Sequence, residues 1–389
     1  MEASGASQST HASADRGGRP WVVLAGGGTG GHLYPGLALV EALRTRLDAA
    51  DITFFGTTRP IDERLTAAQG CGLVRQPVQP FPSRPWRWPA FLWNLRRAVA
   101  DAARRFSARR PAFVLGLGGY AAAPPILAAS HLGIPTALFN PDAVPGRANR
   151  RLARRVGEIF VQWPQTARHF MGVRAAIHVT GCPVRAAVFR ATAGEGRARF
   201  GLDSRRRTLL VTGASQGARS INEACVALSD LWRARSDWQL LHLTGATDFT
   251  AVRDGYASAG VEARVLDYTD DLPLALAGAD LVLSRAGAST LAELTARGVP
   301  SVLLPYPYDR ARHQRANAEV LAEHGAAVVI DDRREPGANA VRLAEALRGL
   351  MDDAARRDRM ADAARSLGRP EAADQMAERL LEPAGSSGS

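Results

Sequence analysis

Residues 24–43 read LAGGGTGGHLYPGLALVEAL, a run of glycines between a short apolar segment and an amphipathic one. The apolar residues Trp21–Ala25 predict a buried strand, and the residues after the glycines predict a helix from about Leu33 to Leu47. The glycines satisfy G-x-G-x-x-G over residues 26–31, a spacing that lets backbone N–H groups approach an anion at the start of a helix. The stretch therefore predicts a strand, an anion-binding loop and a helix in succession.

Two features decide which ligand this loop suits. A dinucleotide-binding loop is followed by an acidic residue at the end of the second strand, where it holds the ribose hydroxyls. Here the second strand, DITFFG (51–56), is followed by no acidic residue before Asp62, which disfavours a nicotinamide cofactor. His32 stands where the helix begins. It is either a residue that caps or packs at the helix start or a general base, because imidazole takes up a proton near neutral pH.

The C-terminal half begins with the same succession of elements. TLLVTG (208–213) predicts a strand, ASQGARS (214–220) a loop, and the residues around Asn222 and Leu228 a helix. Further short apolar runs alternate with helical segments, in WQLLHLTG, ARVLDY, ADLVLSRAG, PSVLLPYP and AAVVI. Such runs are typical of parallel sheets covered by helices on both faces. We therefore expect an α/β chain of two Rossmann-like, doubly wound domains facing a cleft, with ligands at the carboxyl ends of the strands.

Length and composition suit a globular chain of two domains, with 389 residues, 46% apolar and 22% charged. No apolar run approaches the roughly 18 residues of a membrane span, and the N-terminus does not look like a signal peptide. The three scattered cysteines suit a reducing cytoplasm, and no metal site is expected. The expected organisation is a disordered leader (1–19), an N-terminal domain (20–186), a C-terminal domain (187–365), a helix that packs back on the N-terminal domain (366–382) and a disordered tail (383–389).

Positive charge is concentrated in the first half of the chain. Residues 1–190 hold 24 arginines against 10 acidic residues, and residues 191–389 hold 25 against 28, which gives net charges of +14 and −3. An N-terminal half this basic predicts a polyanionic partner, either nucleic acid or an anionic membrane surface. No nucleic-acid-binding module is recognisable, so nucleic acid is not expected as the partner.

Aromatic residues and arginines interleave in FPSRPWRWPAFLWNLRRAVADAARR (81–105). This mixture is typical of segments that lie at the headgroup boundary of an anionic bilayer. The alternative is that some of the tryptophans pack in the core. The residues expected to face the membrane are Trp86, Trp88, Phe91 and Trp93.

A second glycine-containing loop allows two interpretations. Gly213 to Gly217 fits G-x-S-x-G, the turn that carries the nucleophilic serine of many hydrolases. A hydrolase would also need an acid such as Asp280 and a histidine, His313 or His324, and nothing local supports them. The same small residues suit an anion-binding loop in which Ser215 donates a hydrogen bond to a phosphate.

SRAGASTLAEL (284–294) predicts a strand that breaks into small residues and then a helix with Glu293 in its first turn. A carboxylate there accepts hydrogen bonds from a ribose diol while the unpaired N–H groups of the helix start face an anion. The alternative is a capping box of Thr290 and Glu293. Further along, Gln314 and Asn317 are three residues apart and share one helical face.

Taken together, these stretches resemble the MurG family. The matching segments occur in family order over roughly residues 20–365: GGGTGGHLYPGLALVEAL, GLGGYAAAPP, IPTAL with AVPGRANRRLA, TGCPVR, GASQGARSIN, SRAGASTLAEL and HQRANAEVLAEHGAA. The resemblance implies a GT-B type, metal-independent glycosyltransferase without a cofactor. It also implies transfer of GlcNAc from UDP-GlcNAc to lipid I, undecaprenyl-pyrophosphoryl-MurNAc-pentapeptide, to form lipid II at the cytoplasmic face of the bacterial membrane.

The resemblance also implies roles for individual residues. His32 becomes the candidate base for the acceptor hydroxyl, and direct attack inverts the anomeric carbon. The donor lies mainly on the C-terminal domain, with Glu293 on the ribose and Gln314 on the sugar. The residues expected to contact UDP-GlcNAc are Thr29, Gly30, Gly31, Asp142, Arg185, Ser215, Thr269, Ala288, Ser289, Thr290, Leu291, Ala292, Glu293 and Gln314.

The chain departs from the family pattern in two places. The family usually has His-Glu-Gln-Asn where this chain has Phe139 to Asp142, so that Asp142 stands at the position of a sugar-contacting Asn and offers no donor. Cys182 replaces the Asn of a Gly-Asn-Pro segment. These changes leave open a second interpretation, a related glycosyltransferase with a different lipid acceptor or UDP-sugar.

Overall fold

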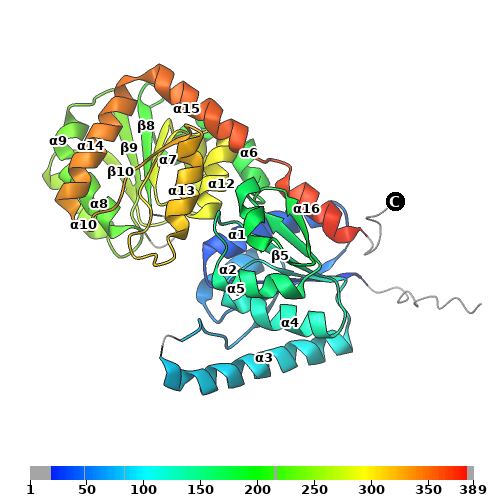
Figure 1. Cartoon of the computed structure of the whole chain (residues 1–389). Coiled ribbons are helices and arrows are strands. Elements are labelled where there is room, and N and C mark those ends of the chain that lie inside the picture. The colour runs from blue at the N-terminus through cyan, green and yellow to red at the C-terminus, as the bar shows by residue number, and fades with distance from the viewer. Residues whose placement is uncertain (1–18, 48, 83, 214–216, 383–389) are drawn as a thin grey trace, which may run out of the picture.

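The computed structural model describes residues 19–47, 49–82, 84–213 and 217–382 of the chain. Two parallel β-sheets, each with helices on both faces, form two halves that lie side by side (Figure 1). The α/β class and the doubly wound architecture predicted from the sequence are thus confirmed. Ser215, residues 1–18 of the expected leader (1–19) and the expected tail 383–389 lie outside the described residues.

The N-terminal sheet has the strand order β3-β2-β1-β4-β5-β6-β7, all parallel. Strand β1 (Trp21–Ala25), in the interior of the sheet between β2 and β4, is completely buried, as its uninterrupted apolar sequence requires. The other strands are β2 (Asp51–Gly56), β3 (Gly72–Arg75), β4 (Phe113–Gly116), β5 (Thr136–Asn140), β6 (Glu158–Val161) and β7 (Ala176–Val179). The helices of this half are α1 (Gly30–Arg44), α2 (Pro60–Ala68), α3 (Trp88–Ala108), α4 (Ala123–His131) and α5 (Arg147–Leu152), with single 3-10 turns η1 (Pro85–Arg87), η2 (Tyr120–Ala122), η3 (Ala153–Arg155) and η4 (Pro164–Phe170).

Helix α1 begins at Gly30, three residues before the predicted start, and ends at Arg44 instead of Leu47. Thr29 is the extended residue before the helix, so Gly30 and Gly31 form part of the first turn. A Cβ atom at Gly30 would lie 2.9 Å from the ring of Tyr34. Packing therefore requires glycine at position 30, and the low helix propensity of glycine is the reason why the sequence pattern predicts a later helix start.

The C-terminal sheet has the order β10-β9-β8-β11-β12-β13, again all parallel. Its strands are β8 (Arg207–Thr212), β9 (Trp238–Leu243), β10 (Ala263–Leu266), β11 (Leu281–Ser284), β12 (Ser301–Leu303) and β13 (Ala327–Val329), which match the predicted apolar runs. The helices around it are α8 (Arg219–Ala227), α9 (Ser229–Arg233), α10 (Phe249–Ser258), α11 (Leu272–Ala277), α12 (Ala288–Arg297), α13 (His313–Glu323), α14 (Pro336–Asp352) and α15 (Ala354–Leu367).

The chain passes between the two halves twice. Helices α6 (Ala186–Arg190) and α7 (Ala193–Phe200) lead from the first sheet to the second, and α7 starts with a capping box of Thr192 and Glu195. The last helix, α16 (Ala372–Leu381), returns and packs its apolar face, with Met376 at its centre, on α1 (Figure 1). This second crossing packs on α1, the helix that follows the first glycine loop, in an apolar cluster that also contains Ala292 of α12.

Candidate active site

A buried carboxylate shapes the first glycine loop. Asp62, in the first turn of α2, is fully buried and accepts hydrogen bonds from the backbone N–H groups of Gly28 (2.7 Å) and Thr57 (2.6 Å) and from the Thr57 hydroxyl (2.9 Å). A Cβ atom at Gly27 would lie 2.2 Å from Asp62 Oδ2, so this position requires glycine. The first acidic residue after β2 is therefore committed to the loop and not to a ribose, which further disfavours a dinucleotide site.

His32 lies in the first turn of α1, with its ring against the glycine loop that follows β4 (117–119). Thr29 stands at the cap position, and its Oγ1 lies 3.2 Å from His32 Nδ1. Cβ atoms at Gly118 and Gly119 would lie 3.2 Å and 3.1 Å from carbons of the imidazole, and both glycines have positive φ, 101° and 74°. Only glycine therefore lets this loop approach the ring, and His32 is not the helix cap.

The surroundings of His32 favour its neutral form. Burial lowers the pKa of His32 below the ordinary value of 6.5, against the opposing charge of Asp142 and a hydrogen bond to the Gly27 backbone. An imidazole with a lowered pKa is unprotonated at neutral pH and can accept a proton. His32 thus has the protonation state that a general base needs.

The start of helix α12 faces the first glycine loop across the boundary between the two halves, which is called the seam below. Gly287 occupies the cap position without a side-chain hydrogen bond, so the N–H groups of Ala288, Ser289 and Thr290 have no acceptor within the helix. Ser289 Oγ donates a hydrogen bond to the Gly31 carbonyl, at 2.8 Å. The N-terminal ends of α1 and α12 therefore meet, and both direct partial positive charge to the same place.

Two expectations for this helix are wrong. Because α12 begins at Ala288, Glu293 is its sixth residue and lies in the second turn, not the first. The capping box of Thr290 and Glu293 does not form, since the cap position belongs to Gly287. Glu293 is instead buried, at 6% exposure, and its carboxylate points toward Arg185, just before α6.

Glu293 pairs with Arg185, the residue that precedes α6. Arg185 Nη2 donates to Glu293 Oε1 at 3.3 Å, and the guanidinium lies 4.4 Å from the centroid of the Tyr34 ring. Burial raises the pKa of Glu293, and the Arg185 charge opposes this shift. The carboxylate has further acceptor positions for hydroxyl groups that enter the seam, as a ribose diol would require.

Helix α13 brings two amides to the same place. Gln314 Oε1 accepts hydrogen bonds from the backbone N–H groups of Ala286 (3.3 Å) and Tyr306 (2.9 Å). Asn317 is fully buried and crosses the seam: its Nδ2 donates to Asp142 Oδ1 at 2.9 Å and its Oδ1 accepts from the Ala143 N–H at 2.8 Å. Asn317 therefore ties the loop that departs from the family pattern to the C-terminal half.

The loop that carries Asp142 is ordered by two buried asparagines. Asn140 Nδ2 donates to the Asp142 carbonyl at 2.7 Å, and Asn149 Nδ2 donates to Asn140 Oδ1 at 2.9 Å. Phe139 packs in the apolar core beneath them. Cys182, the other departure, is also buried, and burial raises the pKa of its thiol well above the usual range. Asp142 is thus held by a hydrogen bond from a neutral amide, and Cys182 is a buried neutral thiol.

The loop after β10 closes one end of the seam. Thr269 Oγ1 accepts from the Asp271 N–H at 3.0 Å, and the Tyr268 hydroxyl lies 3.4 Å from that of Tyr34 and accepts from Arg64 at 2.9 Å. A cavity of about 600 Å³ lies beside this loop and is lined from both halves of the chain, with Arg185 on its wall. The seam is therefore accessible beside Thr269, one of the residues expected to contact UDP-GlcNAc.

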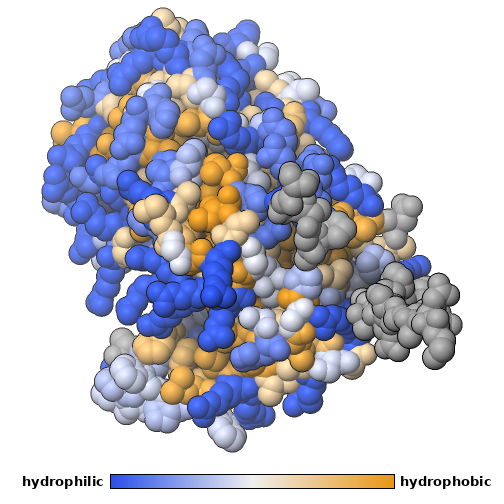
Figure 2. Space-filling view, turned by 45° about the vertical axis from the view of Figure 1, so that its right-hand side comes forward, coloured by the Kyte–Doolittle hydropathy of each residue, from blue (hydrophilic) through white to orange (hydrophobic). Residues whose placement is uncertain are grey.

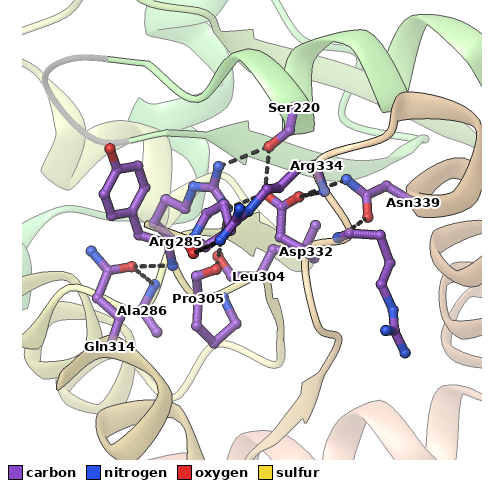
Figure 3. A network of polar contacts seen from close by, with 12 residues as sticks. Ser220, Arg285, Ala286, Leu304, Pro305, Gln314, Asp332, Arg334 and Asn339 are labelled. Carbon is purple, nitrogen blue, oxygen red and sulfur yellow. Dashed lines mark hydrogen bonds and ion pairs between the residues drawn. The ribbon is translucent and has the colours of Figure 1, made fainter. Parts of the chain in front are cut away.

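A network of polar residues that no sequence motif indicates lies beneath the donor turn (Figure 3). Arg285, only 8% exposed, donates to the Leu304 carbonyl (3.0 Å), Asp332 (2.7 Å) and the Ser220 hydroxyl (2.8 Å). Burial raises the pKa of Asp332, but hydrogen bonds from Ser220, Asn339 and Arg285 outweigh it and lower the pKa overall. The network joins segments that follow β8, β11, β12 and β13, so it fixes the loops at the carboxyl ends of four strands.

The structure brings most of the predicted donor residues to one seam, on which the first loop, Arg185, Asp142, the start of α12 and Gln314 converge.

The acid and the histidines that a hydrolase would need lie elsewhere in the fold. Asp280 precedes β11 at the amino end of the sheet, where it accepts from the Thr208 N–H at 2.8 Å. His313 Nδ1 contacts the Val144 carbonyl at 2.8 Å, and His324 Nδ1 contacts a carbonyl of its own helix. Within the described ranges, no three His, Cys, Asp or Glu side chains form a group that could hold a metal ion.

Aromatic side chains are exposed at the start of α3. Trp86 is 70% exposed, Trp88 44% and Trp93 63%, so the alternative that these tryptophans pack in the core is wrong. Phe91 is half-buried, because its ring packs on that of Phe81 at 5.2 Å. Helix α3 lies at the outer edge of the N-terminal half (Figure 1). Figure 2 shows hydrophobic residues at the surface of this half, whereas hydrophilic residues cover most of the C-terminal half.

Comparison with known proteins agrees with this geometry. Residues 22–161 match the glycosyltransferase family 28 N-terminal domain, and residues 208–376 match the glycosyltransferase family 28 C-terminal domain. The chain is 36% identical to the UDP-N-acetylglucosamine--N-acetylmuramyl-(pentapeptide) pyrophosphoryl-undecaprenol N-acetylglucosamine transferase of Halothermothrix orenii, over 90% of this chain and 95% of the relative.

Two further relatives agree. The transferase of the same name from Anaeromyxobacter sp. (strain K) is 38% identical over 93% of this chain and 92% of its own. The crystal structure of MurG from Acinetobacter baumannii superposes with a TM-score of 0.71 at 26% identity, over 93% of this chain and 99% of that one. The chain therefore belongs to glycosyltransferase family 28 and, within it, to the MurG family.

Proposed function

We propose that the chain transfers GlcNAc from UDP-GlcNAc to lipid I and forms lipid II. The observation that carries this proposal is the contact between Ser289 and Gly31, which brings the first turn of α12 to the first turn of α1, where His32 lies. A donor diphosphate bound at α12 would thus present its sugar to a neutral imidazole. The relatives named above act on this donor and this acceptor.

The donor would bind mainly to the C-terminal half. The unpaired N–H groups at the start of α12 would hold the diphosphate, and Glu293 would accept hydrogen bonds from the ribose hydroxyls. Gln314 would donate its NH₂ group to the sugar, because its carbonyl oxygen already accepts two backbone N–H groups. Thr269 would line the uracil, and Ser215, outside the described residues, would donate to a phosphate.

The acceptor hydroxyl would then react directly. His32 takes the hydroxyl proton while the oxygen forms a bond to the anomeric carbon, and the bond from that carbon to the UDP oxygen breaks with its electron pair on UDP. The developing negative charge on the leaving diphosphate is stabilised by the helix N-terminus that already binds it. One displacement on the face opposite UDP inverts the anomeric configuration.

Asp142 is the reason to keep the second candidate, a related glycosyltransferase with a different lipid acceptor or UDP-sugar. Its carboxylate accepts from Asn317 at 2.9 Å and can still accept from a sugar hydroxyl, but it cannot donate to one as an amide would. A sugar without the acetamido group or with another hydroxyl orientation would then be the preferred donor.

We further propose that the exposed aromatic end of α3 attaches the protein to the anionic cytoplasmic face of the membrane, where the lipid-linked acceptor lies. Tryptophans surrounded by arginines suit the headgroup region of such a bilayer. Among the described residues no helix has the length and apolar character to cross a bilayer. The attachment proposed here is therefore peripheral.

A transfer assay with several donors and acceptors tests the proposed function. The protein is given UDP-GlcNAc, UDP-GalNAc, UDP-glucose or UDP-galactose, with either a lipid I analogue or diacylglycerol as acceptor. We expect transfer of GlcNAc to the lipid I analogue alone. A preference for another UDP-sugar or for diacylglycerol would favour the second candidate, and no transfer with any pair would contradict both.

A further inference from the structure

A cavity of the N-terminal half lies outside the donor seam and belongs to no assigned site. Its volume is about 470 Å³, and it lies between the carboxyl ends of β2 and β3 and the middle of α3. Carboxyl ends of parallel strands are the usual place for ligands in such sheets. The polar residues that line it are Arg75, Gln76, Asn94, Arg97, Asp101 and Arg104.

The charge of this cavity favours an anion. Asp101 is already paired with Arg104 at 2.8 Å and with Arg105 at 3.0 Å, and these hydrogen bonds lower its pKa. Arg75 pairs with Glu63. Arg97 forms no hydrogen bond or ion pair with any residue that the structure describes, although it lies on the wall of the cavity. One guanidinium is therefore available for a ligand.

Gln76 indicates that the ligand also carries a hydrogen-bond donor. The residue is only 5% exposed, and its Nε2 donates to the Ala121 carbonyl at 2.9 Å. Its Oε1 is buried and has no donor within the described part of the chain. A buried carbonyl oxygen without a donor is uncommon in folded proteins, because its desolvation costs free energy. A ligand N–H or O–H group would satisfy it.

The glycine loop that follows β4 (117–121) lies between the cavity and His32. Ala121, which accepts from Gln76, is the second residue after Gly119, and the space beside Gly119 is filled by the ring of His32. A five-residue peptide in extended conformation reaches about 17 Å. A substituent of the acceptor sugar that starts beside His32 can thus extend to the cavity.

We propose that this cavity binds the peptide of the lipid-linked acceptor by one of its carboxylates, an inference that rests on the proposed function. A peptide offers a carboxylate for Arg97 and a neighbouring amide N–H for Gln76. An ionised diphosphate diester offers acceptors only and leaves Gln76 Oε1 without a donor. The two groups on the cavity wall therefore favour the peptide over the diphosphate.

The test compares two lipid I analogues with short lipid chains in detergent micelles, which removes any effect of the membrane. One analogue has free peptide carboxylates and the other has each of them converted to a carboxamide. For the unaltered protein we expect KM for the amidated acceptor to be about tenfold higher, because a charge-assisted hydrogen bond becomes a neutral one. Arg97→Ala should raise KM for the free-carboxylate acceptor about tenfold and leave KM for the amidated acceptor and for UDP-GlcNAc unchanged.

Arg96→Ala is the matched control, since it removes the same charge from the same helix at an exposed residue that does not line the cavity. It should change neither KM. Equal values of KM for the two acceptors with the unaltered protein would overturn the inference, and so would an equal effect of Arg97→Ala on both, which would indicate the diphosphate. No transfer to either acceptor would contradict the proposed function itself, and the inference with it.

Discussion

Replacing Glu293 by Gln changes one atom of the donor site and gives a sharp prediction. The carboxylate is 6% exposed, lies 3.3 Å from Arg185 Nη2 and belongs to the second turn of α12. A hydrogen bond to a charged acceptor contributes about 1.5–3 kcal/mol and a neutral one about 0.5–1.5 kcal/mol. The difference of roughly 1–2 kcal/mol predicts that Glu293→Gln weakens the binding of UDP about tenfold.

Isothermal calorimetry with UDP measures this loss directly, and circular dichroism shows whether the variant is folded. Glu319→Gln serves as the control, because Glu319 is exposed on α13 and its one ion pair with a described residue is to Arg315 of the same helix. We expect this control to bind UDP as the unaltered protein does. If folded Glu293→Gln keeps its full affinity for UDP, the carboxylate is only the partner of Arg185 and the assignment to the ribose is refuted.

Three further changes give separate predictions. Replacing the exposed Trp86, Trp88 and Trp93 by serine should reduce co-sedimentation with anionic vesicles several-fold and leave UDP affinity intact. Unfolding of this variant would instead show that the tryptophans have a structural role. The charge of Asp142 raises the pKa of His32, so Asp142→Asn should lower this pKa. The acid limb of the plot of turnover against pH, which lies below pH 6.5, should then move to still lower pH, and an upward shift would contradict this. Asp62→Ala leaves three buried donors without an acceptor and should lower the free energy of unfolding by about 3 kcal/mol in urea titrations, while an unchanged midpoint would contradict its role.

Much of the fold follows from the sequence because buried parallel strands are uninterrupted apolar runs. The six runs of the C-terminal half and the first two strands of the N-terminal half were predicted within one or a few residues of their observed bounds. Helix starts were less predictable. Gly30 and Gly31 have low helix propensity, so the sequence pattern places the start of α1 after them, and the contact of Gly30 with the Tyr34 ring is visible only in the structure.

The candidate site was predicted where ligand-facing residues follow strands directly, as at residues 26–32 and 284–293. Residues that hold other parts of the site in place could not be predicted in this way, because they lie far from their partners in the sequence. Asp62 lies six residues after β2 in sequence, yet its carboxylate holds Gly28. Asn317 reaches Asp142 across 175 positions of sequence. Arg285 was detectable in principle, as a charged residue directly after a buried strand, and only tertiary structure gives it the partners Asp332 and Ser220.

The central claim is that His32 takes the acceptor proton at the seam where α1 and α12 meet. The most direct test is single-turnover transfer of GlcNAc to a lipid I analogue at neutral pH, for the unaltered protein and for His32→Ala, with UDP affinity measured in parallel. Loss of a general base should slow transfer roughly 10²–10⁴-fold and leave UDP affinity within about twofold. Near-normal transfer by His32→Ala would contradict the account, because the ring beside Gly118 and Gly119 would then only support the loop.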